Sequence, residues 1–313
     1  MRGRSRRIRA SASGRDAAGG TAAVLFFSQV VVSGLTIGSL YALTALGFAI
    51  IFRATGVVNF AQGEMMMIGA MFALVLFRDY HLGYVASFVL ALGAAWIFGA
   101  LVERVAYRPL LNAPVFTVIL STVAVGQILR SGVRIVRGDE LALFPPILSG
   151  QPFTFMGISL TLLNIGIVVI SLVFLAGFTA FFRWTRIGWA MRATAQNKEA
   201  AALVGVSIPM VFSVSWGISA ALAAAAGILV APLITITPDM GVIGIKGFIG
   251  AIMGGYNTLS GAVVGGFLLG VLENVTGVYI SSTFKDVVTF CVLIAMVMVR
   301  PAGLLGTPET RRV

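Results

Sequence analysis

The sequence predicts an all-α, polytopic integral membrane protein, a helical bundle of about eight to ten transmembrane or re-entrant helices. Of its 313 residues, 58% are hydrophobic and only 11% are charged, whereas soluble domains carry about a quarter charged residues. Six stretches contain no Asp, Glu, Lys or Arg: 17–52, 80–102, 109–129, 141–182, 200–238 and 247–272. Each is as long as the roughly 20 residues that a helix needs to cross the hydrocarbon layer. Barrel strands would alternate apolar and polar residues, and the run at 168–178 does not.

Nine apolar segments follow one another along the chain, and we expect each to form a helix. They are 22–52, 65–77, 83–102, 115–130, 158–182, 208–234, 242–256, 260–280 and 286–300. Residues 1–20 contain six Arg among Gly, Ser and Ala, so we expect a basic, disordered N-terminal tail. The remaining residues divide into a single transmembrane domain at 21–306 and a C-terminal tail at 307–313.

Basic loops give the expected orientation. The stretch 183–198 carries four basic residues and no acid before Lys198, which predicts a cytoplasmic loop. Counting spans back places the basic joint at 104–108 on the same side. If 22–52 is one helix, the Arg-rich tail then lies outside; otherwise that segment breaks near 34–38. The net charge of +11 is explained by such loops, so no nucleic-acid partner is expected.

Small residues recur four apart in several segments, a spacing that lets helix backbones approach closely. They form four sets: Gly34, Gly38 and Ala42; Ser213, Gly217, Ala221 and Ala225; Gly250 and Gly254; Gly261 and Gly265. We expect packing seams there. A fainter pattern is an internal echo at an offset of 181 residues, in which Ile-Gly-Ala at 68–70 recurs at 249–251. Chance and a true repeat explain it equally well, and transporters often contain such repeats.

Catalytic chemistry has little support in this sequence. The one histidine, His81, lies in a short loop, and no Cys or carboxylate cluster suits a metal. No phosphate-binding G-x-x-x-x-G-K-[ST] motif occurs, so this chain is not expected to hydrolyse nucleotides. We expect a transport subunit rather than an enzyme, with no catalytic residues, no metal and no cofactor bound by the chain.

Polar residues interrupt the apolar helices at two places. The segment 55–64 holds Asn59, Gln62, Gly63 and Glu64. It predicts either polar groups lining a membrane cavity or a loop in water followed by a helix start. Lys246 and Glu273 are isolated charges in apolar surroundings, which suit a translocation path or a helix end in the headgroup layer.

The segment 198–205 has a glutamate, a small-residue face and a closing glycine. By composition it is either a plain linker or a short helix that fits a groove on another protein. Its Glu199, Ala200, Ala201 and Gly205 resemble the coupling loop of ABC importer permeases. Further motifs are similar to the H-type subunit of branched-chain amino acid permeases: 34–43, 59–64, Glu103-Arg104-Val105-Ala106-Tyr107-Arg108-Pro109, 186–193, 285–288 and 300–306. The resemblance covers about residues 25–306.

The resemblance implies an ATP-driven importer of branched-chain or related amino acids in the bacterial plasma (inner) membrane, with this chain as its multi-pass permease. Its implied partners are a second, homologous permease subunit forming a heterodimer, two cytoplasmic ATPase subunits that use ATP, a soluble substrate-binding protein and the lipid bilayer. The loop at 183–207 would be the ATPase-coupling loop, with Arg186, Arg192 and Lys198 on its docking surface. Asn59, Gln62, Gly63, Glu64, Lys246 and Glu273 would be candidates for the translocation path.

Two alternatives remain. Urea and short-amide importers use permeases of the same type, so the carried solute is open. From a different class, an ion-coupled secondary carrier or a channel could use Glu64 as an ion or proton site. Uptake without ATP would favour that alternative.

Overall fold

The structure is a computed structural model that describes residues 4–111, 113–138, 143–146, 148, 150–155 and 157–306. Side chains are described from Ala23 onward, apart from Phe155. The expected C-terminal tail at 307–313 lies outside the described residues.

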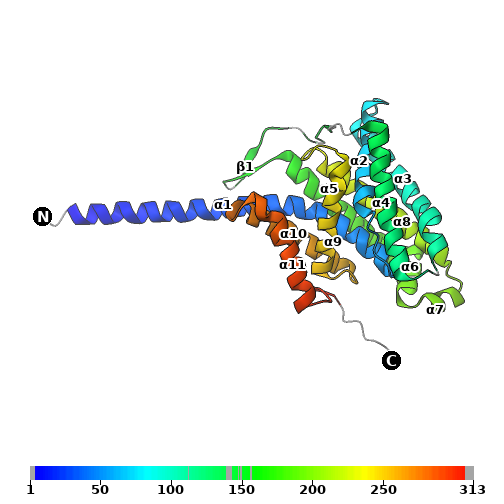
Figure 1. Cartoon of the computed structure of the whole chain (residues 1–313). Helices are drawn as coiled ribbons and strands as arrows, with labels where there is room; N and C mark the ends of the chain where they lie inside the picture. The colour runs from blue at the N-terminus through cyan, green and yellow to red at the C-terminus, as the bar shows by residue number, and fades with distance from the viewer. Residues whose placement is uncertain are drawn as a thin grey trace.

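The described chain is a bundle of helices with one small hairpin (Figure 1). Its α-helices are α1 (Arg4–Thr55), α2 (Gln62–Arg78), α3 (Tyr84–Val102), α4 (Val115–Arg137), α5 (Leu162–Trp184), α6 (Arg186–Gln196), α7 (Lys198–Leu203), α8 (Ile208–Val230), α9 (Val242–Gly254), α10 (Leu259–Tyr279) and α11 (Lys285–Val299). Shorter elements are the π-helical η1 (Glu103–Tyr107), the 3-10 turns η2 (Arg108–Leu110), η3 (Pro238–Gly241) and η4 (Ser282–Phe284), and strands β1 (Phe153–Phe155) and β2 (Ile158–Leu160). The all-α prediction is confirmed.

Each of the nine apolar segments contains a helix. Within the described residues, seven helices are long and apolar enough to cross a membrane; they lie in Ala23–Thr55, Tyr84–Leu110, Val115–Arg137, Leu162–Trp184, Ile208–Val230, Leu259–Tyr279 and Ser282–Val299. The shorter α2 and α9, of 17 and 13 residues, pack among them. These two helices position the polar groups discussed below.

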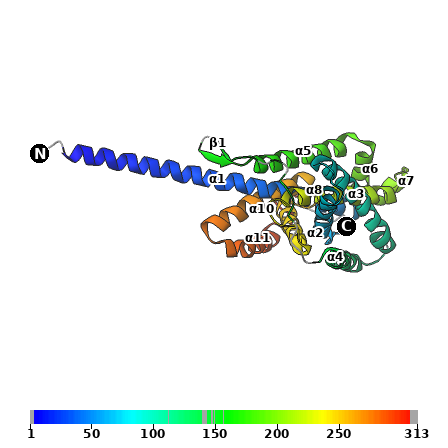
Figure 2. The same cartoon turned by 90° about the horizontal axis from the view of Figure 1, so that it is seen from above.

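The first helix is unbroken and longer than expected. α1 extends over 52 residues, which corresponds to about 78 Å at 1.5 Å per residue, and its amino-terminal part projects from the bundle (Figures 1 and 2). The expectation of a disordered tail at 1–20 therefore differs from the structure, which is helical from Arg4. Adding a residue to an existing helix needs no new nucleus, and Ala and Arg are good helix formers.

Three of the four predicted seams, in α1, α9 and α10, are confirmed as contacts between helix backbones, whereas Gly217 of the set in α8 contacts the Trp96 side chain. A Cβ atom built on Gly270 of α10 would lie 2.3 Å from the Cα atom of Gly38 in α1, so these helices touch along 34–42 instead of α1 breaking there. A Cβ on Gly254 of α9 would lie 1.8 Å from the carbonyl oxygen of Gly261 in α10. Only glycine fits such contacts.

Helix packing supports the internal echo. An offset of 181 residues matches α1 with α8, α2 with α9 and α3 with α10. The contacts then occur in equivalent pairs: α1–α10 with α3–α8, α1–α9 with α2–α8, and α2–α3 with α9–α10. Gly63 and Gly244 are 181 residues apart and meet at the centre, where a Cβ on Gly244 would lie 2.3 Å from the Cα of Gly63.

Two groups of elements mark opposite ends of the bundle. At one end, α6 and α7 lie beside the carboxyl end of α1, since the Lys198 ammonium donates to the carbonyl oxygen of Thr55 at 2.6 Å. At the other end, the β1–β2 hairpin contacts α1 through Gln29, whose side-chain amide exchanges two 2.7 Å hydrogen bonds with the backbone of Ser159. The amino end of the α1 span therefore lies opposite the basic loop.

Candidate functional site

The loop at 183–207, which we call the coupling loop, folds into two short helices with defined ends. Thr185 caps the amino end of α6, and the side chain of Asn197 caps α7 by accepting from the Ala200 amide at 2.9 Å. At the other end of α7, the amides of Val206 and Gly205 donate to the carbonyls of Ala201 and Ala202 at 3.0 Å. This is a Schellman motif, and Gly205 has the positive φ of 88° that the motif requires.

The outer face of α7 is apolar and exposed. We call it the coupling tip, formed by Glu199, Ala200, Leu203 and Val204, all of them exposed. Leu203 and Val204 are 88% and 79% exposed. Ala201, by contrast, is buried against the body of the loop. An exposed apolar end on a rigidly capped helix is typical of a surface that another protein covers.

Two of the three cations expected on a docking surface face inward instead. Arg192 donates to the backbone carbonyls of Phe182 and of Arg183, at the carboxyl end of α5. Lys198 donates to the backbone carbonyl of Thr55, at the carboxyl end of α1. Cations at carboxyl ends are favoured by the helix dipole. Partial burial lowers the pKa of the Lys198 ammonium, because desolvation penalises its charged form. Arg186 is exposed.

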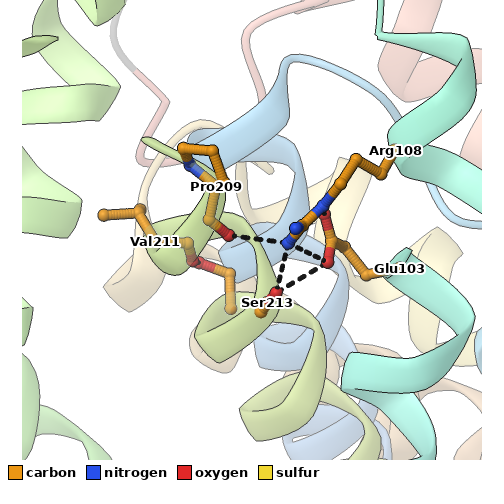
Figure 3. Close-up of polar contacts among 6 residues, drawn as sticks. Glu103, Arg108, Pro209, Val211 and Ser213 are labelled. Atoms are coloured by element: carbon orange, nitrogen blue, oxygen red, sulfur yellow. Dashed lines mark hydrogen bonds and ion pairs between the residues drawn. The ribbon is translucent and has the colours of Figure 1, made fainter. Parts of the chain in front are cut away.

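At the end of the bundle that carries the coupling loop, a buried ion pair connects the carboxyl end of α3 to α8 (Figure 3). The guanidinium of Arg108 donates to both carboxylate oxygens of Glu103, at 3.1 and 2.9 Å, and Glu103 is fully buried. Arg108 also donates to the Ser213 hydroxyl at 2.8 Å and to the Pro209 carbonyl at 3.2 Å. Ser213 in turn donates to Glu103 at 2.7 Å. The first turn of α8, which directly follows the coupling loop, is therefore fastened to η1 and η2.

A separate cavity of about 240 Å³ lies between α1, α2, α4 and α9, and we call it the Glu64 cavity. Its polar lining includes Glu64, Gln127 and Arg130, and its aromatic lining is Phe48, Phe60 and Phe248. The Phe248 ring centroid lies 5.2 Å from that of Phe48 and 5.5 Å from that of Phe60. Gly63, Gly126, Gly241 and Gly244 complete much of the wall with bare backbone.

An ion-pair network forms the polar side of the Glu64 cavity. Arg130 donates to Glu64 at 2.7 Å and lies 3.7 Å from Asp239, which Arg134 contacts at 3.1 Å. The Glu64 and Arg130 side chains are only 10% and 24% exposed. Among the described residues, the buried Nε of Arg130 has no hydrogen-bond partner.

Asn59 and Gln62 lie near this cavity but face the protein interior. Both are fully buried. The Asn59 carboxamide oxygen accepts from the Ala61 amide at 3.0 Å and fixes the turn before α2. The Gln62 amide donates to the Ser219 carbonyl at 3.1 Å and joins α2 to α8. Of the candidate residues at 59–64, Gly63 and Glu64 therefore line the cavity.

Lys246 and Glu273 form a second cluster on the other side of α9. Lys246 pairs with Glu273 at 2.5 Å and with Asp286 at 2.9 Å, and the Tyr41 hydroxyl donates to Glu273 at 2.7 Å. This cluster lines its own cavity of about 240 Å³. Four of the six residues expected on one path thus line two cavities that α9 separates, and Asn59 and Gln62 line neither of them.

Sequence reasoning missed the partners of these charges. Arg130, Arg134 and Arg137 stand four and three residues apart, which places them on one face of α4, but the helix expected at 115–130 ends at the first of them. Asp239 is a single acid in its segment and gave no signal, and Asp286 was named only as part of the motif at 285–288. Among the described residues, no group of three His, Cys, Asp or Glu could hold a metal ion.

Comparisons with known proteins agree with these motifs. The family described as "Branched-chain amino acid transport system / permease component" matches residues 30–297. The high-affinity branched-chain amino acid transport system permease protein LivH of Escherichia coli K12 is 33% identical, over 92% of this chain and 98% of its own length. BraD of Pseudomonas aeruginosa, a permease protein of the same description, is 35% identical over 93% of this chain and 99% of its own.

A more distant relative is the probable branched-chain amino acid transport permease protein LivH of Methanocaldococcus jannaschii, 29% identical over 89% of this chain and 92% of its own length. No solved structure is significantly similar to this chain. Since the matched region runs from α1 to α11 and contains both the coupling loop and the Glu64 cavity, the chain belongs to the family of permease components of branched-chain amino acid transport systems.

Proposed function

We propose that this multi-pass protein of the bacterial inner membrane is one permease subunit of an ATP-driven importer for branched-chain or related amino acids. The observation that carries the proposal is the coupling tip: a capped helix that exposes Leu203, Val204 and Glu199 beside the carboxyl ends of two membrane helices. The names of the relatives support the class of solute.

The proposed assembly contains four further components. A second, homologous permease completes the membrane pore, two cytoplasmic ATPase subunits bind and hydrolyse ATP, and a soluble binding protein delivers the solute. This chain itself binds no cofactor. The exposed, apolar coupling tip suits a groove on one ATPase subunit, because apolar anchors surrounded by polar groups dominate such interfaces.

Three contacts would transmit movement of the coupling tip into the membrane. Lys198 connects the loop to α1, and Arg192 connects it to α5. The Glu103–Arg108 pair connects α8 to η1 and so to α3. On this proposal the inward-facing cations act as mechanical links, whereas the coupling tip makes the docking contact.

The test is ATP-driven uptake by the complete complex in proteoliposomes, combined with ATPase pull-down. Glu199→Arg should abolish both ATPase association and uptake of leucine, because the reversed charge lies in the docking face. Arg104→Glu is the matched control: it reverses an exposed charge in η1, and it should leave both measurements unchanged. Unaltered uptake and association in Glu199→Arg would contradict the assignment of the docking surface.

The two alternatives give different results. A urea or short-amide importer would require that the binding protein encoded beside this gene selects urea over leucine. An ion-coupled carrier would transport without ATP or ATPase, with Glu64 as the ion site. The pairing of Glu64 with Arg130 weighs against that alternative, because an arginine already occupies the carboxylate.

A further inference from the structure

The Glu64 cavity places opposite charges beside an apolar surface. Glu64 and Arg130 lie on its polar side, 2.7 Å apart, and the cluster of Phe48, Phe60 and Phe248 lies in its wall. Its volume of about 240 Å³ is below the roughly 300–1,000 Å³ typical of sites for drug-sized ligands. The cavity therefore suits a small solute with two charges and an apolar part.

The hydrogen bonding of Arg130 is incomplete. Its terminal nitrogens contact Glu64 and Asp239, whereas its buried Nε has no partner among the described residues. Leaving a buried donor unpaired is costly. A guanidinium offers Nε and a terminal nitrogen as a fork that matches the two oxygens of a carboxylate. The unpaired Nε thus points to a carboxylate ligand.

Glycines create the space beside these charges. A Cβ atom on Gly241 would lie 2.9 Å from one Glu64 carboxylate oxygen, and a Cβ on Gly126 would lie 3.2 Å from the other. Side chains at positions 126 and 241 would crowd the Glu64 carboxylate. Glycine at both positions leaves room for a ligand to approach that carboxylate.

We propose that the Glu64 cavity is a transient binding site for the zwitterionic head of an α-amino acid, an inference that rests on the proposed function. Arg130 binds the carboxylate through Nε and a terminal nitrogen, Glu64 binds the ammonium, and the three phenylalanines contact the aliphatic side chain. The solute takes the place of the direct Glu64–Arg130 contact. Both buried charges stay paired throughout, which avoids the large cost of an unpaired charge at membrane depth.

This assignment separates amino acids from neutral amides. Urea has no carboxylate for Arg130 and no ammonium for Glu64, so it cannot replace the ion pair. A solute that lacks the carboxylate leaves Arg130 unpaired, and a solute that lacks the ammonium leaves Glu64 unpaired. Both charges of the solute are therefore required.

The test measures binding of radiolabelled leucine to the purified full complex of permeases and ATPases in lipid nanodiscs, without the binding protein. Wild type should bind leucine saturably. Neither isocaproate, which lacks the ammonium, nor isoamylamine, which lacks the carboxylate, should compete at equal concentration. Arg130→Gln should weaken leucine binding about 10- to 100-fold, the range expected for hydrogen bonds to a charged group. The leucine affinity of Arg130→Lys should lie between those of wild type and Arg130→Gln, because lysine keeps the positive charge but lacks the paired nitrogens of the guanidinium.

Arg137→Gln is the matched control, since Arg137 lies on the same helix and pairs with Asp79 outside the cavity. It should bind leucine as wild type does.

Three results would overturn the proposal: no saturable binding by wild type, unchanged binding in Arg130→Gln, or equal competition by isocaproate. ATP-driven leucine uptake with the binding protein is measured in parallel on wild type. If uptake persists while the binding results fail, the site is wrong and the proposed function stands. If uptake itself is absent, the proposed function fails.

Discussion

The coupling loop and the Glu64 cavity are built in opposite ways. The coupling loop is local: α6 and α7 are adjacent in sequence, and capping groups within a few residues set their ends. The Glu64 cavity gathers residues from α1, α2, α4 and α9, up to about 200 positions apart in the chain. The loop exposes apolar side chains, whereas the cavity encloses charged ones.

The two regions also differ in what their exposed or charged side chains contact. Leu203 and Val204 are exposed, and under the proposed function another protein covers them, so the coupling loop keeps its shape without contacts from these two side chains. Glu64 and Arg130 stabilise one another inside the bundle. Substitutions in the coupling tip should therefore impair assembly without unfolding the chain, whereas substitutions in the cavity should affect stability as well as transport.

The largest expected effect is on the coupling tip. Leu203→Asp combined with Val204→Asp should weaken ATPase association by about 30-fold or more, because interface anchors contribute about 2 kcal/mol or more. Uptake should fall with it, while the thermal unfolding temperature of the permease stays constant. Pull-down and thermal scans on one preparation check this, with Leu203→Met as the conservative control. A large fall in the unfolding temperature would contradict the expectation that the coupling tip affects assembly and not the stability of the fold.

Glu64→Ala should act mainly on the fold. It leaves the Arg130 charge without its closest partner, and removing one member of a buried pair costs about 3 kcal/mol. Denaturation in detergent should show this loss, while ATPase association remains at the wild-type level. Loss of ATPase association with unchanged stability would contradict the division between the two regions.

Gly205→Ala tests the end of α7 alone. Its φ of +88° is unfavourable for a residue with a Cβ, by about 1–2 kcal/mol, although the space around it is open among the described atoms. We expect a modest decrease in ATP-driven uptake, measured as initial rate. Gly132→Ala in α4 also has open space and an ordinary helical backbone, so it should be neutral or slightly stabilising.

The smallest effect belongs to the pair of Arg137 with Asp79. Both side chains are more than a third exposed, so water screens their attraction. Arg137→Gln should change the free energy of unfolding by less than about 1 kcal/mol, as exposed ion pairs usually do. Chemical denaturation measures this value, and a change as large as that of Glu64→Ala would contradict the role assigned to burial.

Local and compositional features of the fold could be predicted from the sequence. Uncharged stretches located the membrane helices because lipid excludes charge over the full length of a span. For α7, composition left a plain linker and a short helix open, and Gly205 marked the position where the helix ends. The spacing of Gly34 and Gly38 gave the α1 seam, since four-residue spacing puts both on one helix face.

Non-local pairing could not be predicted. Arg130 meets Glu64 and Asp239 only because α2, α4 and η3 converge, and no periodicity in the sequence encodes that convergence. Likewise, the inward direction of Arg192 and Lys198 depends on where α1 and α5 end. The composition of residues 1–20 does not predict the helical amino end of α1, which continues from the apolar part of the same helix.

The meeting of Gly63 with Gly244 constrains how the protein can change shape. With the two backbones this close, no side chain lies between α2 and α9 where they cross, so a larger residue at either position would force the two helices apart. α4 contacts this crossing through two ion pairs, Arg130 with Glu64 and Arg134 with Asp239. Glycine at this crossing thus sets the distance between α2 and α9.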